Sequence, residues 1–466
     1  MKKLIRQVTV IAIILMLMLI FTACENSDEK LTTEDLLNDF DYMMQTMEDT
    51  FPYFGVVERK LGVDIRALGM ETRTIIENYP YSLETTANKL GISLEDMPDL
   101  DEHIFWSIIY HEFFSHFMRF AHTFVLDFSR YNMYQPAFSN RFSFLYTPNN
   151  YNVFTNHVSQ KFYQEQEDFY NTIFEDQEAL FQFVFRDVLP VTVPSHNIVE
   201  TEIIEEDRVA YLKISSFSNF DPSAVSTTLK TFYRDINEYE HLIIDIRDNY
   251  GGSTDFWRMI IMKPLLAYRE NMPDMPLYAF FRGSKLGKSL AKDYLEIESQ
   301  YSRYMPETDD LLSVNEIMES NNLPYISEDD LQDLDYGVKF NAGIGNIELQ
   351  HLRQLGFPNI SGQPFKGKVW LLTNENNYSA SALFAHHAKE MGFATLVGEQ
   401  VGGAYAINGA HFTLPNTGII LRWDIDYLTD NYGNALNEFP TTPHHFNNLG
   451  MDALETVLQL IEEGSF

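Results

Sequence analysis

The sequence contains a single cysteine, Cys24, among 466 residues. One cysteine cannot form a disulfide within the chain, and it cannot supply the thiolates of a cysteine-based zinc site. Basic residues are also scarce: 33 lysines and arginines face 67 acidic residues, and the formal net charge is −34. So acidic a chain repels phosphate backbones and anionic membrane surfaces. This argues against nucleic-acid binding and against membrane association without a dedicated anchor.

Aromatic residues, in contrast, make up 14% of the chain, and hydrophobic residues make up 45%. Disorder over the whole length is therefore excluded, because disordered chains are poor in aromatic residues. The length corresponds to two or three domains of roughly 150 residues each.

The N-terminus has the pattern of an exported bacterial lipoprotein. Residues 1–6 carry three positive charges, and residues 8–21 are apolar apart from one threonine. Such a run is too short for a comfortable transmembrane helix and is typical of a signal peptide. It ends at residues 21–24 in Phe-Thr-Ala-Cys, which resembles the bacterial lipobox. The resemblance implies cleavage before Cys24, lipidation of its thiol and an extracytoplasmic protein anchored to the bacterial membrane. The alternative is an uncleaved N-terminal anchor.

Hydrophobic periodicity divides the rest of the chain into a helical part and an α/β part. Apolar residues recur at three- and four-residue steps over 36–47, which is the period of an amphipathic helix. Later, the runs 369–373 and 394–397 read as strands around a helix at 380–391. Such a βαβ unit requires a right-handed crossover and a mostly parallel sheet.

We therefore predict an α/β fold preceded by a helical N-terminal domain. The expected segments are a signal peptide, a tether, the helical domain, a linking region of unassigned fold and an α/β core: 1–23, 24–33, 34–130, 131–200 and 201–455. The core carries a charged insertion at about 265–360.

Two loops of the α/β part have the composition of a reactive site. The apolar strand 242–246 runs toward Gly251-Gly252, where backbone N–H groups can approach a ligand without obstruction. Such donors form the oxyanion holes of acyl-transfer enzymes. The second loop places Ser379 between a strand and a helix, with the N–H of Ala380 as a further donor. Taken alone, these features are also explained by a structural turn and a helix N-cap.

Considered together, several stretches resemble the C-terminal-processing (tail-specific) and tricorn-core serine peptidases in order and spacing. The stretches are 211–217, 243–252, 371–384 and 396–399, and the resemblance covers about 205–450. It implies a catalytic core of the crotonase/ClpP-like ββα type. It places the nucleophile at Ser379, with Ser381 as the nearest rival, and the oxyanion donors at Gly251 or Gly252 and at Ala380.

The resemblance also bears on the general base. The processing branch of the family uses a lysine at the position of Ala404, and no lysine lies near it here. The tricorn-like branch uses a histidine that follows a helix and is usually followed by threonine, which matches His122-Thr123. The resemblance therefore implies that His122 accepts the proton of Ser379 and returns it to the leaving amine. A hydrogen-bonded structural histidine is the alternative.

The tricorn-like branch orients its histidine with a carboxylate that comes shortly before a Pro-Asp pair. Glu438 precedes Pro443-His444 at nearly that spacing, although phenylalanine replaces the family's glycine and histidine its aspartate. The resemblance therefore points to Glu438, with Asp424 and Asp426 as alternatives.

No metal or cofactor is expected. His111, Glu112 and His116 superficially resemble a zinc-peptidase helix, but three residues separate Glu112 from His116 where the zinc motif has two. Histidines five residues apart point about 140° apart on a helix and do not share an ion.

The sequence thus predicts a cell-envelope lipoprotein that hydrolyses peptide bonds in a peptide or polypeptide substrate. Two other classes remain open. One is an inactive peptidase scaffold that binds a ligand or peptide, which is favoured by the missing lysine and by Ala382, where the family usually has glutamate. The other is an esterase that uses the same serine and histidine.

Overall fold

The structure is a computed structural model, and most of the chain from residue 30 to residue 464 is described. The stretches that are not described within this range are 85–86, 88–92, 119, 141–146, 174–197, 219–220, 267–274, 302–304, 309, 343–363 and 407–408. The predicted signal peptide and the lipidation candidate Cys24 lie outside the described residues.

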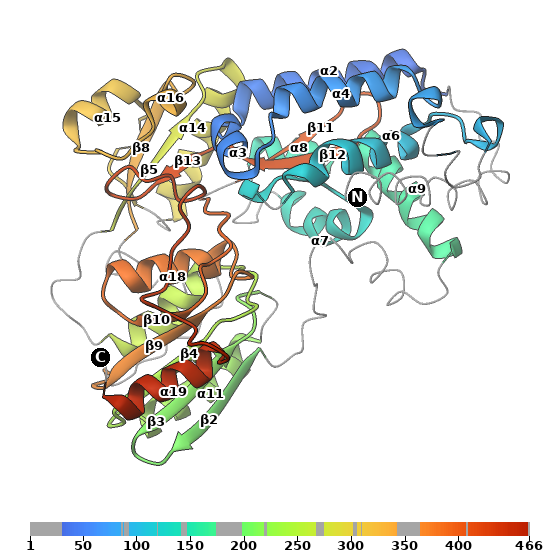
Figure 1. Cartoon of the computed structure of the whole chain (residues 1–466). Coiled ribbons are helices and arrows are strands. Elements are labelled where there is room, and N and C mark those ends of the chain that lie inside the picture. Colours follow the sequence, from blue (N-terminus) through green and yellow to red (C-terminus); the bar gives the residue numbers. More distant parts are fainter. Residues whose placement is uncertain are drawn as a thin grey trace.

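A six-stranded sheet forms the lower lobe in Figure 1. Its strands are β2 (Val199–Glu205), β3 (Val209–Ile214), β4 (His241–Asp245), β9 (Lys368–Thr373), β10 (Thr395–Gly398) and β14 (His445–Phe446). Their order is β14-β10-β9-β4-β3-β2, and every neighbouring pair is parallel except β2 with β3. The predicted α/β class with a mostly parallel sheet is therefore confirmed.

Helices cover both faces of this sheet, which explains why its central strands are continuous apolar runs. On one face, Trp370 and Val397 pack with Val457 of α19 (Ala453–Glu463) in a small separate core. On the other face, Leu371 and Leu396 belong to the main core, together with α11 (Pro222–Asp235) and α18 (Ala380–Glu390). Between α11 and α18 in sequence, the short helices α12 (Thr254–Phe256), η7 (Trp257–Met262) and α13 (Lys263–Leu265) follow the Gly251-Gly252 turn.

The upper lobe contains the N-terminal helices (Figure 1). They are α2 (Thr33–Thr50), α3 (Phe54–Leu61), α4 (Ile65–Glu77), η2 (Tyr81–Leu83), η3 (Leu94–Asp96), α6 (Glu102–Ile108), η4 (Ile109–Phe113), η5 (Phe114–His116), η6 (Phe120–His122), α7 (Phe128–Phe138), α8 (Pro148–Phe154) and α9 (His157–Ile173). The helix α2 begins at a capping box in which Thr32 and Asp35 exchange hydrogen bonds. The linking region that had no assigned fold thus contains α8 and α9.

A three-stranded sheet joins these helices to the C-terminal half of the chain. The strand β1 (Phe124–Val125) pairs with β12 (Ile420–Asp424), which in turn pairs with β11 (Gly409–Thr413). Trp423 of β12 points toward the C-terminal end of α2, since it stacks on Phe412 and donates a hydrogen bond to Thr50. The helical lobe is therefore completed by strands that come nearly three hundred residues later.

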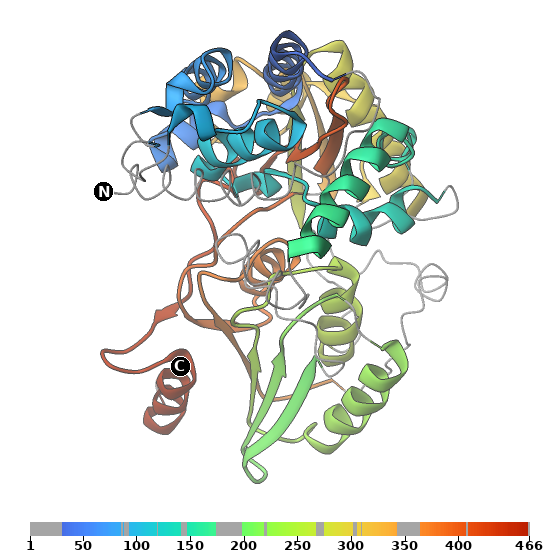
Figure 2. The same cartoon turned by 90° about the vertical axis from the view of Figure 1, so that its right-hand side faces the viewer.

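The predicted insertion contributes most of a further sheet beside the helical lobe, seen in yellow to orange in Figures 1 and 2, and β13 (Tyr427–Thr429) from the C-terminal part of the chain completes it. The strands of the insertion are β5 (Pro276–Phe281), β6 (Met305–Pro306), β7 (Leu312–Ser313) and β8 (Tyr336–Asn341), and its helices are α14 (Lys285–Tyr301), α15 (Val314–Ser320) and α16 (Glu328–Leu331). The order is β13-β5-β8-β6, with β7 also paired to β8. Among the described residues, no helix is long and apolar enough to cross a membrane.

Two adjacent histidines of α18, His386 and His387, lie in the interior. Burial lowers the pKa of His386 to about 4 and that of His387 to about 3. Nδ1 of His387 donates to the carbonyl of Leu383 at 2.8 Å, whereas its Nε2 has no partner among the described residues. Both rings are therefore neutral in the folded protein at neutral pH.

We expect these histidines to make the fold sensitive to acid. An unfolded histidine has a pKa of about 6.5, so below this pH the unfolded chain binds more protons than the folded one, and stability falls toward pH 4. Each ring lowers the free energy of unfolding by up to roughly 1.4 kcal/mol for every pH unit below its unfolded pKa in this window. Urea unfolding of the wild type and of His386→Gln at several pH values measures this dependence. The free energy of unfolding of the variant should fall less steeply with decreasing pH. An unchanged slope would contradict the conclusion that His386 is buried in its neutral form.

Candidate active site

Ser379 stands at a sharp turn between β9 and α18. Its backbone has φ 57° and ψ −123°, which is uncommon for a residue other than glycine and marks a strained position. Its N–H donates to the carbonyl of Gly403 at 3.0 Å, which holds the turn. Its side chain makes no capping hydrogen bond to α18, so the hydroxyl is not used as a helix cap. A strained strand-to-helix turn that presents a serine is typical of a nucleophile.

Ser381, the rival serine, is fully buried within the same turn. Its Oγ accepts a hydrogen bond from the N–H of Tyr378 at 2.9 Å and also contacts the carbonyl of Asn249. These bonds occupy the hydroxyl and tie the serine loop to the loop after β4. Ser381 therefore has a structural role, whereas the hydroxyl of Ser379 has no hydrogen-bond partner in the described part of the chain.

The Gly251-Gly252 turn packs directly against Ser379. A methyl group on Gly251 would lie 2.8 Å from the amide nitrogen of Ala380 and 3.0 Å from Cβ of Ser379, so only glycine fits. The N–H of Gly251 donates to Oδ1 of Asn249 at 2.9 Å and is therefore engaged. Within the described part of the chain, the N–H groups of Gly252 and Ala380 have no hydrogen-bond partner. The geometry thus favours Gly252 over Gly251 as the partner of Ala380 in anion binding.

His122 reaches this loop from the helical lobe. Ala121 and His122 both have positive φ values, of 48° and 46°, in a turn that directs the imidazole inward, and His122 is only 7% exposed. Its ring meets the ring of Tyr378, the residue before Ser379, edge to face with centroids 5.0 Å apart. The sequence-predicted histidine and serine are therefore brought to one place from opposite lobes.

The carboxylate that holds His122 is Asp424, at the end of β12. Nδ1 of His122 lies 2.8 Å and 3.1 Å from the two carboxylate oxygens, and Asp424 is fully buried. Because a carboxylate oxygen accepts, this bond favours the ring form with its proton on Nδ1, in which Nε2 is the acceptor. Asp424 was one of the two alternatives to Glu438.

The role expected of Glu438 is therefore corrected by the structure. Its carboxylate accepts two hydrogen bonds from Arg59, at 2.8 Å and 2.7 Å, and Arg59 also binds Asp330. Glu438 thus belongs to an ion-pair network on α3. Asp424 is reached instead because β12 pairs with β1, the strand that directly follows His122.

Ala404, at the family's lysine position, lies close to the serine loop, whereas the described group with metal-ligand geometry lies elsewhere. Ala404 is buried, has φ 55°, and follows Gly403, whose carbonyl binds the N–H of Ser379. The grouping with metal-ligand geometry in the described ranges is Glu102, His103 and Glu165, on α6 and α9. It lies in the helical lobe and not in the serine loop.

Replacement of Gly251 by alanine is expected to disrupt this site. The added methyl would lie 2.5 Å from the carbonyl oxygen of Tyr378, and the φ of 95° disfavours any side chain. Gly392→Ala is the matched control, since Gly392 also has a positive φ but nothing lies within 4 Å of the added methyl. Urea unfolding should show a loss of about 1 kcal/mol for the control and clearly more for Gly251→Ala. Equal losses of unfolding free energy in the two variants would show that Gly251 is not tightly packed against the Ser379 loop.

Comparison with known proteins places this site in a family. The model of peptidase family S41 matches residues 208–271 and 296–445, which include both the Gly251 turn and Ser379. A search of curated proteins finds no match. Similar solved structures include a lipoprotein from Streptococcus agalactiae, which is 10% identical, with 95% of this chain and 99% of that chain covered and a TM-score of 0.43.

Two solved proteases are also similar. Mature CPAF is 12% identical, with 93% of this chain and 99% of that chain covered and a TM-score of 0.47. The photosystem II D1 C-terminal processing protease is 12% identical, with 58% of this chain and 53% of that chain covered and a TM-score of 0.32. Residues 208–271 and 296–445 thus match peptidase family S41, the C-terminal-processing or tail-specific serine peptidases.

Proposed function

We propose that the protein is a cell-envelope lipoprotein that hydrolyses peptide bonds with Ser379 as nucleophile, His122 as general base and Asp424 as the carboxylate that orients His122. The observation that carries the proposal is the buried bond between His122 and Asp424, beside the loop of Ser379. A carboxylate that fixes a histidine next to a serine with an uncommitted hydroxyl is the arrangement that activates a serine for acyl transfer.

The reaction follows from these positions. Oγ of Ser379 attacks the carbonyl carbon of the scissile peptide bond while Nε2 of His122 takes the hydroxyl proton. The N–H groups of Gly252 and Ala380 donate to the oxyanion that develops. The intermediate then collapses, the C–N bond breaks, and His122 gives its proton to the leaving amine. Water then gives a proton to His122 and attacks the acyl carbon; the C–O bond to Ser379 breaks, His122 returns the proton to Oγ, and the acid is released.

The His122–Asp424 pair can also replace the lysine base that this chain lacks at Ala404. A lysine base would have to lose its proton near the serine, whereas a neutral histidine accepts one directly. Ala404 therefore does not by itself argue for an inactive scaffold. Burial of Asp424 matters here, because a carboxylate shielded from water stabilises the imidazolium more strongly than an exposed one.

The position of the protein in the cell envelope rests on the N-terminal sequence pattern. The charged start, the apolar run and the lipobox-like residues before Cys24 support cleavage and lipid anchoring. The expected substrate is then a peptide or polypeptide outside the cytoplasm.

A fluorophosphonate probe tests the proposal, because it modifies only activated serines. Applied to residues 25–466, it should label Ser379, as located by mass spectrometry. Ser379→Ala and His122→Ala should abolish labelling, and Asp424→Asn should slow peptide turnover by roughly 10³- to 10⁴-fold, since the amide favours the wrong histidine tautomer.

Glu438→Gln serves as the control for the carboxylate assignment. It removes a charge in the Arg59 network and should label at the wild-type rate. Slow labelling of Glu438→Gln together with normal labelling of Asp424→Asn would reverse the assignment. A wild type that takes up no probe at any pH would favour the inactive, peptide-binding scaffold.

A further inference from the structure

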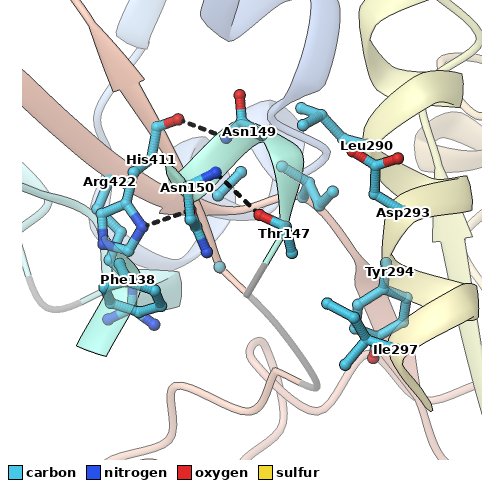
Figure 3. Close-up of a pocket in the computed structure, with 13 residues that line it drawn as sticks. Phe138, Thr147, Asn149, Asn150, Leu290, Asp293, Tyr294, Ile297, His411 and Arg422 are labelled. Carbon is cyan, nitrogen blue, oxygen red and sulfur yellow. Dashed lines mark hydrogen bonds between the residues drawn. The ribbon is translucent and has the colours of Figure 1, made fainter. Parts of the chain in front are cut away.

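A cavity of about 150 Å³ lies beside the proposed active site, between β11–β12, α8 and α14. Figure 3 shows Leu290, Asp293, Tyr294 and Ile297 of α14 on one side, opposite His411 and Arg422. The floor near the proposed active site includes Gly409 and Ile425. Gly409 is the direct cross-strand partner of Asp424, and Ile425 follows Asp424 in the chain.

The cavity and the His122–Asp424 pair lie on the same face of the three-stranded sheet. Arg422 and Asp424 are two residues apart on β12, so their side chains point to the same face, about 7 Å apart along the strand. His411 of β11 and Phe124 of β1 lie directly across from Arg422. The row that contains Arg422 is thus the next row after the one that contains Asp424.

Among the described residues that line the cavity, Arg422 is the one with a cationic side chain. Within the described ranges it forms no ion pair, and its Nε is buried without a hydrogen-bond partner. Its guanidinium packs over Phe124, 5.3 Å from the ring centroid, and against Gly409, whose missing side chain makes room for it. Since acidic residues outnumber basic ones two to one, a partly buried arginine without a carboxylate partner indicates a site for an external anion.

The neighbouring His411 defines a second polar position. It is 2% exposed, its Nδ1 donates to Oδ1 of Asn150 at 3.0 Å, and its Nε2 has no partner in the described part of the chain. Burial, followed by the charge of Arg422, lowers the pKa of His411, so the ring is neutral and Nε2 is an acceptor. Asn149 fixes the strand by donating to the carbonyl of His411 at 2.9 Å (Figure 3).

The opposite wall constrains where a ligand's charge can lie. Asp293 of α14 lines the cavity, and a carboxylate there repels a second carboxylate. An anionic ligand group is therefore directed to Arg422. The remaining wall, formed by Leu290, Tyr294 and Ile297, suits an apolar portion of the same ligand.

We propose that this cavity is a subsite in which Arg422 binds a carboxylate of the substrate on the leaving-amine side of the scissile bond. This inference rests on the proposed function. The imidazole that protonates the leaving amine must lie beside it, and the cavity borders the row that holds this imidazole. An Asp or Glu side chain and the free C-terminal carboxylate supply the same group, and both match the planar fork of arginine.

Matched peptides test the proposal and separate the two sources. A peptide that the enzyme cleaves is first identified by mass spectrometry from a mixed library. It is then made in four forms, with Glu or Gln after the scissile bond and with a free or amidated C-terminus. The wild type should prefer one carboxylate form by about 10- to 100-fold in kcat/KM. In Arg422→Gln the ratio between the acid and amide forms should fall to about 1, and Arg422→Lys should retain part of it.

Further variants keep the outcome interpretable. Arg234→Gln, which removes an exposed charge on α11, should leave the ratio unchanged. Asp293→Asn should raise the ratio, because it removes the opposing carboxylate. This variant decides the question if thermal melting shows that Arg422→Gln is not folded. No preference in the wild type, or a preference that survives in folded Arg422→Gln, would overturn the proposal.

Failure of the peptidase proposal has a different signature. It appears as absent fluorophosphonate labelling of Ser379, whatever the peptide. Fluorescence polarisation with the same four peptides, labelled with fluorescein, then measures peptide binding at the cavity independently of turnover. Binding that depends on the carboxylate and on Arg422 would support the subsite, and binding that is equal for all four peptides would exclude it.

Discussion

The contact on which the proposed chemistry depends is the bond between His122 and Asp424. It joins residues 302 positions apart in the chain, and it is buried. Its existence depends on the pairing of β1 with β12, because this pairing sets the strand end that carries Asp424 beside the turn that carries His122. The positive φ values of Ala121 and His122 then turn the imidazole toward Tyr378. Backbone strain at this turn is stabilised by the surrounding core.

The serine side of the site is organised by polar groups that have no direct part in the reaction. Asn249 binds the carbonyl of Ile214 and the N–H of Gly251, and Ser381 bridges the two loops. Each of these side chains is buried and engaged, so the loops are held by hydrogen bonds that would be costly to break in a dry interior. The consequence is a rigid turn in which the hydroxyl of Ser379 and the N–H groups of Gly252 and Ala380 have no partner among the residues that the structure describes.

The two lobes therefore divide the work. The parallel sheet and α18 present Ser379 and the proposed oxyanion donors, whereas the helical lobe and its three-stranded sheet supply the proposed base His122, its carboxylate partner Asp424 and the adjacent cavity. Strands β11 and β12 belong to the C-terminal half of the sequence but to the helical lobe in space. This crossing of the chain couples the lobes.

The sequence by itself determined the α/β class, the parallel sheet and the meeting of Gly251 with Ser379. Apolar runs of strand length between amphipathic helices allow only a few topologies, and loops that follow neighbouring parallel strands leave the same edge. The strands β4 and β9 are such neighbours. The sequence also pointed to His122, through the resemblance of His122-Thr123 to the tricorn-like branch, as a prediction of the base.

Only the tertiary structure decided which carboxylate meets His122, which glycine N–H stays free and what surrounds Arg422. Asp424, Asp426 and Glu438 are all acidic residues near the end of the chain, and no local periodicity distinguishes them. The choice was made by strand pairing between distant segments, by the capture of Glu438 by Arg59, and by the side-chain bond from Asn249 to Gly251. These are long-range contacts or side-chain geometries, and such interactions are set by the packed fold and not by residue spacing.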